Sequence, residues 1–290
     1  MDLWWKFHGT TRGNHNTPML VPDVRAEQVG AGEYHTIIMS DTGDVWACGY
    51  NDQGQLGLGS RGNNIYNSRL TQIPDIKATN VAMGRYHMAI VSPLGEVRTC
   101  GYNNEGCLGL GNNSSYRVPQ LIPNIPAMKQ VACGNAHTVM LAVDGTVWTC
   151  GWNIVGQLGL GDNNNRDIPT IIPGLLAQQV VAGDSHTVAL LIDGSVMSWG
   201  RNKHGQLGLG DNVDRYSPTL ISDIRAQQVA VGNAHTVMLA VDGGVWTCGR
   251  NYAGQLDLGD NVDQDTPTLV QGIPPARQVA AGGDQTMIIL

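Results

Sequence analysis

The stretch Val131-Ala132-Cys133-Gly134-Asn135-Ala136-His137-Thr138-Val139-Met140-Leu141 determines the architecture of this chain, because variants of it recur along the whole sequence. Each copy contains the motif Gly-x-x-His, and a last, degenerate copy has glutamine in place of histidine. The copies lie at residues 32–35, 84–87, 134–137, 183–186, 232–235 and 282–285, so that successive copies are 49 to 52 residues apart. Self-similarity at such a period indicates a protein built of structural repeats.

Each repeat unit has the pattern of four short β-strands. In the third unit, residues 138–143 are apolar and β-branched, Asp144-Gly145 is a hairpin turn signal, and residues 147–150 return antiparallel. Residues 156–161, rich in glycine, predict a tight corner, and residues 169–175 predict a third strand at an edge that tolerates proline. Residues 179–182 then lead into the next unit. Such units in series predict an all-β fold, the β-propeller. A superhelical β-solenoid is the alternative, but its turns are far shorter than this repeat.

The two chain ends set the expected number of blades. The strand after Gly-x-x-His occurs six times and the return strand five times, so the sequence stops one hairpin short of a sixth blade. The segment Leu3-Trp4-Trp5-Lys6-Phe7 could supply the missing strand. We therefore predict a single propeller domain over residues 1–290 with six four-stranded blades. Pairing of residues 3–7 with the strand that ends at Leu290 should close the ring. Seven blades would require a pairing that the pattern does not indicate.

Composition narrows the classes of partner. The chain of 290 residues contains 38 glycines, only 14% charged residues and a formal net charge of −7. Because phosphate binding needs a concentrated Lys/Arg surface, we expect no nucleic-acid partner. The longest apolar runs have the length of strands, so we expect no integral membrane segment, and the first residues lack the pattern of a signal peptide. We expect a monomer.

The six cysteines follow the repeat rather than a disulfide framework. One position of the repeat carries Cys48, Cys100, Cys150 and Cys248, and Trp199 occupies the same position in the fourth unit. A position that accepts either cysteine or tryptophan indicates packing rather than a cross-link. We therefore expect six free thiols and a reducing, cytoplasmic location.

The motifs Gly-x-x-His-Thr, Asp-Gly-x-Val-Trp and Gly-x-Asn-x-x-Gly-Gln-Leu-Gly-Leu-Gly resemble the repeat of the RCC1 (regulator of chromosome condensation) family over essentially the whole chain. The resemblance implies a propeller that interacts with other proteins. The founding members of the family are guanine-nucleotide exchange factors for a Ran-type small GTPase and also bind chromatin. Other members are inhibitors, photoreceptors, or effectors of intracellular bacteria that act on host GTPases. Export into a host cell is therefore an alternative to a purely cytoplasmic role.

The chain departs from the founding members in ways that bear on exchange activity. Those members have seven blades and a wedge-like insertion, for which the even spacing of this repeat leaves no room, and they carry a basic tail that is missing here. The photoreceptors have tryptophan inside Gly-x-x-His, where this chain has other residues. The resemblance thus implies binding of a protein, with a small GTPase as the suggested partner. Guanine-nucleotide exchange on a Ran-like GTPase and a bacterial effector role are the alternatives.

No pattern of residues indicates catalysis, a metal or a cofactor. Five evenly spaced histidines could suggest a metal site, but blades stack about 10 Å apart, whereas zinc ligands approach to about 2 Å. We interpret these histidines as side chains that hydrogen-bond within their own blade. Residues 57–62 match a dinucleotide fingerprint only formally, since no helix follows. The acidic loop 260–265 lacks the glycine and distal glutamate of a calcium loop, so a solvated turn is favoured. A propeller hydrolase or lyase is the enzymatic alternative.

One rim of the propeller is the predicted binding surface. A hairpin brings the two residues inside Gly-x-x-His next to the residue before the asparagine of Gly-x-Asn. The residue types at these positions are not fixed by the repeat. Along the chain they are Glu33, Tyr34 and Tyr50; Arg85, Tyr86 and Tyr102; Asn135, Ala136 and Trp152; Asp184, Ser185 and Arg201; and Asn233, Ala234 and Arg250. Tyrosine, tryptophan and arginine dominate the energetics of protein interfaces. We therefore predict a partner-binding rim with aromatic residues on three consecutive blades.

Overall fold

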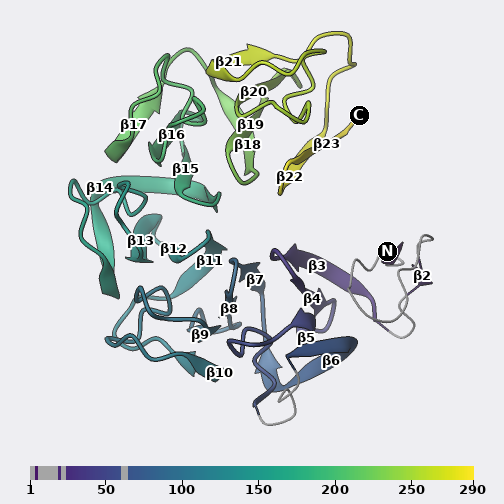
Figure 1. The fold of residues 1–290 in the computed structure, drawn as a ribbon, viewed down its shortest axis with the longest axis vertical. Coiled ribbons are helices and arrows are strands. Elements are labelled where there is room, and N and C mark those ends of the chain that lie inside the picture. Colours follow the sequence, from purple (N-terminus) through teal and green to yellow (C-terminus); the bar gives the residue numbers. More distant parts are fainter. Residues whose placement is uncertain (1–3, 6–18, 21–23, 60–64) are drawn as a thin grey trace.

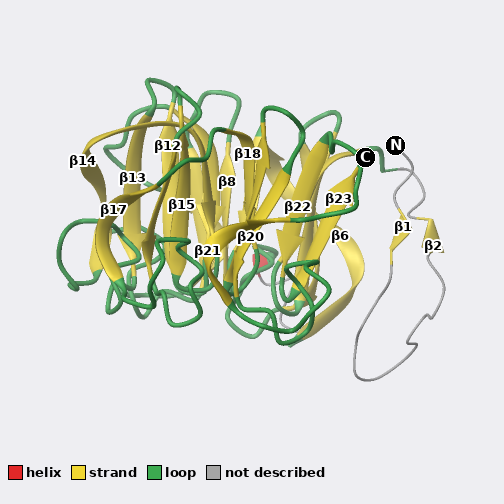
Figure 2. Cartoon of the chain, turned by 90° about the horizontal axis from the view of Figure 1, so that it is seen from above, coloured by secondary structure: helices red, strands yellow, loops and turns green. Residues whose placement is uncertain are grey.

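The computed structural model describes residues 4–5, 19–20, 24–59 and 65–290, and this part of the chain is built of β-strands without an α-helix. The strands form five four-stranded units that follow one another around a common centre (Figure 1). Two two-stranded sheets lie at the ends of the chain. We call the five units blades 1 to 5 in chain order. Figure 2 shows the strands running between two rims of loops.

Each blade takes four strands that are consecutive in sequence. Blade 1 consists of β3 (Ala26–Ala31), β4 (His35–Ser40), β5 (Asp44–Tyr50) and β6 (Tyr66–Lys77). Blade 2 consists of β7 (Asn80–Met83), β8 (His87–Val91), β9 (Val97–Gly101) and β10 (Tyr116–Leu121). Blade 3 consists of β11 (Met128–Cys133), β12 (His137–Ala142), β13 (Thr146–Gly151) and the first half of β14 (Arg166–Ala182). Blades 4 and 5 consist of the second half of β14, β15 (His186–Leu191), β16 (Val196–Gly200) and β17 (Arg215–Ile221); and of β18 (Ala226–Val231), β19 (His235–Ala240), β20 (Val245–Gly249) and β21 (Gln264–Leu269). The end sheets pair β22 (Gln278–Gly282) with β23 (Gln285–Ile289), and β1 (Trp4–Trp5) with β2 (Met19–Leu20).

The predicted hairpin of each repeat is present in the expected register. In blade 3, Leu141 pairs with Val147 and His137 pairs with Gly151, so the turn at Asp144-Gly145 joins β12 to β13. Gly145 has a φ of 91°, a conformation that residues with a side chain rarely adopt. The long strand β14 is the outer strand of blade 3 and the inner strand of blade 4, which confirms the predicted passage from one unit to the next.

The Gly-x-Asn-x-x-Gly-Gln-Leu segment forms a corner held by a buried asparagine. Asn153 Oδ1 accepts a hydrogen bond from the backbone N of Leu158 at 2.9 Å, and its Nδ2 donates to the backbone O of Asp162 at 2.9 Å. The same pair of contacts recurs in blade 5, where Asn251 Nδ2 donates to Asp260 in the acidic loop. The acidic loop therefore holds the corner of its blade.

Neighbouring blades pack through apolar side chains and through a repeated glutamine bridge. The core between blades 2 and 3 contains Val97, Val131 and Met140, all buried. Gln130 Nε2 donates to the backbone O of Val180 at 2.9 Å, and Gln130 Oε1 accepts from the N of the same residue at 3.1 Å. Gln28, Gln179 and Gln228 make the same pair of bonds to the next blade. On blade 2, Asn80 takes this place and its Oδ1 accepts from the N of Val131 at 2.8 Å, so each inner strand is tied to the next one around the ring.

The motif histidines do not hydrogen-bond within their own blade, and the interpretation made from the sequence is wrong on this point. His137 Nε2 lies 3.1 Å from Thr187 Oγ1 in the next blade, and His87, His186 and His235 make the same contact. Thr187 Oγ1 itself donates to the backbone O of Gln157 at 2.9 Å. Because the hydroxyl proton of Thr187 is donated to that carbonyl, Thr187 Oγ1 acts as the acceptor toward His137, and Nε2–H of the histidine is the donor. The glycine of the motif is required because a Cβ at Gly134 would overlap the imidazole of His137.

The predicted closure of the ring by residues 3–7 is not found. Leu3, Lys6 and Phe7 lie outside the described residues, while Trp4 and Trp5 pair with Leu20 and Met19 in β2. Among the described strands, β23 pairs with β22 alone. A partner less than twenty residues away costs less chain entropy to reach than one at the far end of the chain. Figures 1 and 2 show β2 outside the ring, apart from β23.

The exposure of equivalent residues marks the open ends of the ring. Val29 on the inner strand of blade 1 is 48% exposed, whereas its counterparts Val81, Val131 and Val229 are at most 3% exposed because a preceding blade covers them. On the last strand, Ile289 is 55% exposed. The described chain thus contains five complete blades and the two inner strands of a sixth unit, not a closed six-bladed ring.

All six cysteines are free and buried, as predicted. The repeat position that alternates between cysteine and tryptophan faces a backbone carbonyl of the preceding blade. Trp199 Nε1 donates to the O of Gln157 at 3.0 Å, and Cys150 Sγ lies 3.5 Å from the O of Cys107. Both residue types combine apolar bulk with a donor, which explains why either one fits. Within the described residues, no helix is long and apolar enough to cross a membrane.

Candidate binding surface

The backbone brings the predicted rim positions together in every complete blade. The N of Trp152 donates to the O of Ala136 at 2.8 Å, which joins the start of β12 to the end of β13. The equivalent bonds link Tyr50 with Tyr34, Tyr102 with Tyr86, Arg201 with Ser185, and Arg250 with Ala234, at 2.8 to 2.9 Å. The shared rim that the hairpin pattern predicts is therefore confirmed. We call it the Gly-x-x-His rim. That it binds a partner stays a prediction.

Four tyrosines form a continuous row across blades 1 and 2. The ring centroids of Tyr34 and Tyr50 lie 6.2 Å apart, those of Tyr50 and Tyr86 6.4 Å apart, and those of Tyr86 and Tyr102 6.4 Å apart. These separations are typical of edge-to-face and tilted aromatic pairs, which add stabilisation beyond their buried area. We call this set the tyrosine row. Tyr34, at its end, is 54% exposed, and the other three rings are half-buried.

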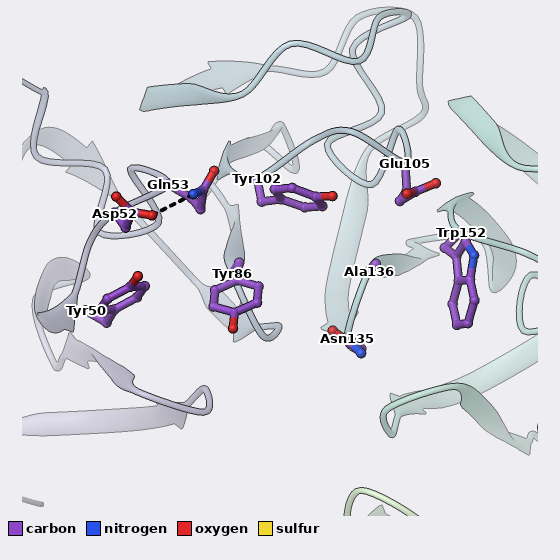
Figure 3. Close-up of a pocket in the computed structure, with 9 residues that line it drawn as sticks. All are labelled: Tyr50, Asp52, Gln53, Tyr86, Tyr102, Glu105, Asn135, Ala136 and Trp152. Carbon is purple, nitrogen blue, oxygen red and sulfur yellow. Dashed lines mark hydrogen bonds between the residues drawn. The ribbon is translucent and has the colours of Figure 1, made fainter. Parts of the chain in front are cut away.

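A pocket of about 530 Å³ opens beside the tyrosine row (Figure 3). Its lining combines aromatic, carboxylate and amide side chains from blades 1 to 3, namely Tyr50, Asp52, Gln53, Tyr86, Tyr102, Glu105, Asn135, Ala136 and Trp152. Figure 3 shows Tyr102 and Trp152 on either side of Ala136 and Asn135, with Glu105 between them. A concave site with several aromatic side chains and a few placed polar groups is the usual form of a binding pocket. We call it the aromatic pocket.

Charged residues of the rim surround the mouth of the central channel. Arg85 forms an ion pair with Glu33, and its guanidinium carbon lies 5.2 Å from the centre of the Tyr86 ring. A cavity of about 600 Å³ at this mouth is lined by the ends of the inner strands and includes Glu33, Arg85 and Asp184. The predicted site residues thus divide into an aromatic group and a charged group around the channel.

Arg201 and Arg250 stand on blades 4 and 5, away from the aromatic pocket. The guanidinium carbon of Arg250 lies 4.1 Å from the centre of the Tyr252 ring, and the hydroxyl of Tyr252 donates to Asp284 Oδ2 at 2.7 Å. Arg201 is exposed and does not line either cavity. The structure therefore brings together eight of the ten predicted residues in the two cavities and the tyrosine row. The two arginines line neither cavity, although the charge of Arg201 acts on the nearby Asp184 carboxyl.

The rim perturbs the acidity of several of its groups. Glu33 raises the pKa of Tyr34, first through a hydrogen bond and then through its charge. Burial raises the pKa of Tyr50, and the nearby Asp52 carboxylate adds to the effect. Asp184 is exposed at the channel mouth, yet the surrounding protein atoms desolvate its carboxyl and raise its pKa. Each of these shifts favours the less negative form of the group.

Asp52, Gln53 and Glu105 belong to the pocket but were missed by reasoning from the sequence. They occupy the two positions after the asparagine of Gly-x-Asn-x-x-Gly, which vary from repeat to repeat as the rim positions do. That variability was the available signal. Tyr252 occupies the same variable segment on blade 5.

The patterns set aside in the sequence have structural roles. Gly57 and Gly59 have φ values of 66° and 58° in the corner of blade 1. Burial lowers the pKa of the motif histidines, to about 3 in the case of His137, so they are neutral. Within the described ranges, no group of three or more His, Cys, Asp or Glu side chains is placed to hold a metal ion.

Comparison with known proteins supports the assignment made from the repeat. The family model of the RCC1-like domain matches residues 7–290. The ultraviolet-B receptor UVR8 of Arabidopsis thaliana is 32% identical over 125 residues, which cover 41% of this chain and 28% of UVR8. The chain therefore matches less than a third of the length of this curated relative.

Two solved structures have the same fold. Human WBSCR16 superposes with a TM-score of 0.84 at 24% identity, covering 94% of this chain and 75% of that chain. Prp20p from Saccharomyces cerevisiae superposes with a TM-score of 0.81 at 21% identity, covering 92% of this chain and 71% of that chain. The repeat register, the blade topology and a family match over nearly the whole sequence agree. The chain belongs to the RCC1-like domain family.

Proposed function

We propose that this protein binds a protein partner through its Gly-x-x-His rim, and that the partner is a small GTPase. The aromatic pocket is the observation that carries the proposal. It places four half-buried aromatic rings on a single rim, across three blades. Rings in such a setting can bury much apolar area at small entropic cost when a partner docks.

Related propellers support a binding role. The structure of Prp20p is described together with its binding properties to Gsp1p and histones. Another structure contains Kap60 bound to yeast RCC1 (Prp20). RCC1-type propellers thus serve as surfaces for proteins. The choice of a small GTPase for this chain rests on its resemblance to the exchange factors of the family.

The test begins with affinity capture on the purified chain, followed by calorimetric titration of the captured protein. Tyr86→Ala, Tyr102→Ala and Trp152→Ala should each weaken binding. Truncation of a central aromatic anchor typically costs about 2 kcal/mol or more, which is roughly thirtyfold in affinity. Each variant should keep the melting temperature within a few degrees, because its side chain is only half-buried at the rim.

The opposite rim supplies matched controls. The turns that join β12 to β13 and β15 to β16 present Val143 and Ile192, which are 64% and 71% exposed. Val143→Ser and Ile192→Ser should leave the affinity within a few fold. Loss of binding in these variants, with no effect at the Gly-x-x-His rim, would show that the partner uses the other face.

Binding and nucleotide exchange are separated by a kinetic measurement. If the partner is a GTPase, release of a fluorescent nucleotide from it should proceed at the same rate with and without this protein. Accelerated release that Trp152→Ala abolishes would assign exchange activity to the rim instead.

A further inference from the structure

The tyrosine row follows a rule of the repeat that blade 3 breaks. Its rings come alternately from the second residue inside Gly-x-x-His and from the residue before the asparagine of Gly-x-Asn. In this order Tyr34, Tyr50, Tyr86 and Tyr102 are each in ring contact with the next. The two positions that follow are Ala136 and Trp152. Blade 3 therefore has an aromatic ring before the asparagine, at Trp152, but none inside Gly-x-x-His, where Ala136 stands.

The missing ring leaves space between two aromatic side chains. Tyr102 and Trp152 both line the aromatic pocket, and among the described aromatic residues these two are not in ring contact with each other. In Figure 3 the small side chain of Ala136 lies between them. Since adjacent rings of the row are 6.2 to 6.4 Å apart, an alanine at this position opens a slot that a planar group can enter.

The charges around the slot favour a cation. The carboxylate of Glu105 lies beside the slot, whereas Asp52 lines the far end of the pocket next to Tyr50 (Figure 3). The pocket lining contains no lysine or arginine; the nearest guanidinium groups are those of Arg85, 5.2 Å from the centre of the Tyr86 ring, and of Arg117, which donates to the backbone O of Asp52 at 2.9 Å. Glu105 is held in place because its Oε2 accepts a hydrogen bond from Asn165 Nδ2 of the next blade at 2.8 Å. Aromatic faces attract cations through their quadrupole, and a carboxylate beside them strengthens the attraction.

The same rim already stacks guanidinium groups on tyrosines. The guanidinium of Arg85 lies over Tyr86 while it pairs with Glu33, and that of Arg250 lies over Tyr252 at 4.1 Å. In the first case one cation contacts both a tyrosine ring and a carboxylate, which is the combination that the slot offers. A guanidinium is planar and carries five N–H donors, so it suits a flat slot with a carboxylate beside it better than an ammonium does.

We propose that the aromatic pocket receives an arginine side chain of the protein partner, with its guanidinium between Tyr102 and Trp152 and hydrogen-bonded to Glu105. This inference rests on the proposed function and names the chemistry that the rim recognises. It makes Ala136 a specificity-determining residue, because a tyrosine there, as on blades 1 and 2, would fill the slot from within.

The probe is a set of capped tripeptides, Ac-Gly-Xaa-Gly-NH₂, with arginine, lysine or citrulline at Xaa. Binding is followed through the indole N–H resonance of Trp152, which Trp152→Phe identifies among the seven tryptophans. Citrulline has the shape of arginine without its charge. We expect the arginine peptide to bind weakly, with a Kd of roughly 1 mM, and about tenfold more tightly than the citrulline peptide. Equal affinity for arginine and citrulline, or tighter binding of lysine, would overturn the proposal.

Two substitutions test the slot itself. Ala136→Tyr should abolish binding of the arginine peptide, whereas Ala234→Tyr, at the same repeat position on blade 5, should leave it unchanged. Glu105→Gln retains an oxygen for Asn165 and should weaken binding about tenfold, toward the affinity of citrulline. Each variant is compared by its melting temperature, so that a loss of fold is not read as a loss of binding. Undiminished binding in Ala136→Tyr would refute the slot.

The outcome can be distinguished from failure of the proposed function. If Trp152→Ala weakens binding of the captured partner but the arginine peptide does not bind, the rim binds proteins and the proposed arginine slot is refuted. If the peptide binds as expected but Ala136→Tyr leaves the affinity for the captured partner unchanged, the slot is real and the partner docks elsewhere.

Discussion

The buried motif histidines should make this fold sensitive to mild acid. These side chains are at most 3% exposed, and they are His35, His87, His137, His186 and His235. Burial lowers their pKa from 6.5 to about 3 or about 4. In the unfolded chain the pKa returns to about 6.5, so between these values the unfolded state binds more protons. The free energy of unfolding is therefore unaffected above pH 6.5 and falls as the pH drops below it.

The magnitude follows from the number of histidines. Each pH unit below 6.5 removes about 1.4 kcal/mol per histidine, as long as the pH stays above the folded pKa. At pH 5 the five together remove on the order of 10 kcal/mol, which is comparable with the 5 to 15 kcal/mol of a typical folded protein. We expect the protein to unfold between pH 6 and pH 5.

The assay is urea unfolding followed by far-ultraviolet circular dichroism, at intervals between pH 7.5 and pH 5. His35→Gln is the informative variant. Neither ring nitrogen of His35 has a hydrogen-bond partner, because Met88 stands where the later blades have threonine. The sixth repeat carries a natural glutamine, Gln285, at this position. This substitution should lower the slope of unfolding free energy against pH by about 1.4 kcal/mol per pH unit. A free energy that is constant from pH 7 to pH 5, or an unchanged slope in the variant, would refute the reasoning.

Two further predictions concern the contacts between blades and the thiols. Thr187→Val removes the partner of His137 Nε2 and one of the two donors to the Gln157 carbonyl, which keeps Trp199 Nε1. Urea unfolding should therefore show a loss of about 2 kcal/mol, most of it from the buried imidazole left unpaired. A change within about 0.5 kcal/mol, roughly that of an ordinary surface substitution, would contradict the bridging role. Thiol titration should detect six thiols in the denatured, unreduced protein. It should detect almost none in the native protein, because burial raises the pKa of thiols such as Cys248 (to about 12). Four or fewer thiols after denaturation would indicate disulfides.

Much of the candidate site could be predicted because it depends on a hairpin. The Asp144-Gly145 turn sets the register of β12 and β13, and this register places Ala136 beside Trp152 whatever the rest of the molecule does. The pocket itself could not be predicted. Its walls come from three blades, and Glu105 enters it from a corner loop whose direction depends on the buried Asn103.

The sequence by itself determined the strands, the turns, the order of the blades and the rim positions, since these depend on hydrogen bonds and alternation within one repeat. Only the tertiary structure decided which blade a histidine contacts. The threonine that bonds His137 lies 50 residues further on and is reached across the packed faces of two blades. The pairing of the strands at the two ends of the ring was also decided by the tertiary structure. The segment that contains Trp4 and Trp5 could supply the missing strand by its sequence. In the structure these two residues pair with β2, which lies nearby in the chain, and not with β23. Pairing within a repeat is local and can be read from spacing, whereas contacts between blades depend on how complete units stack in space.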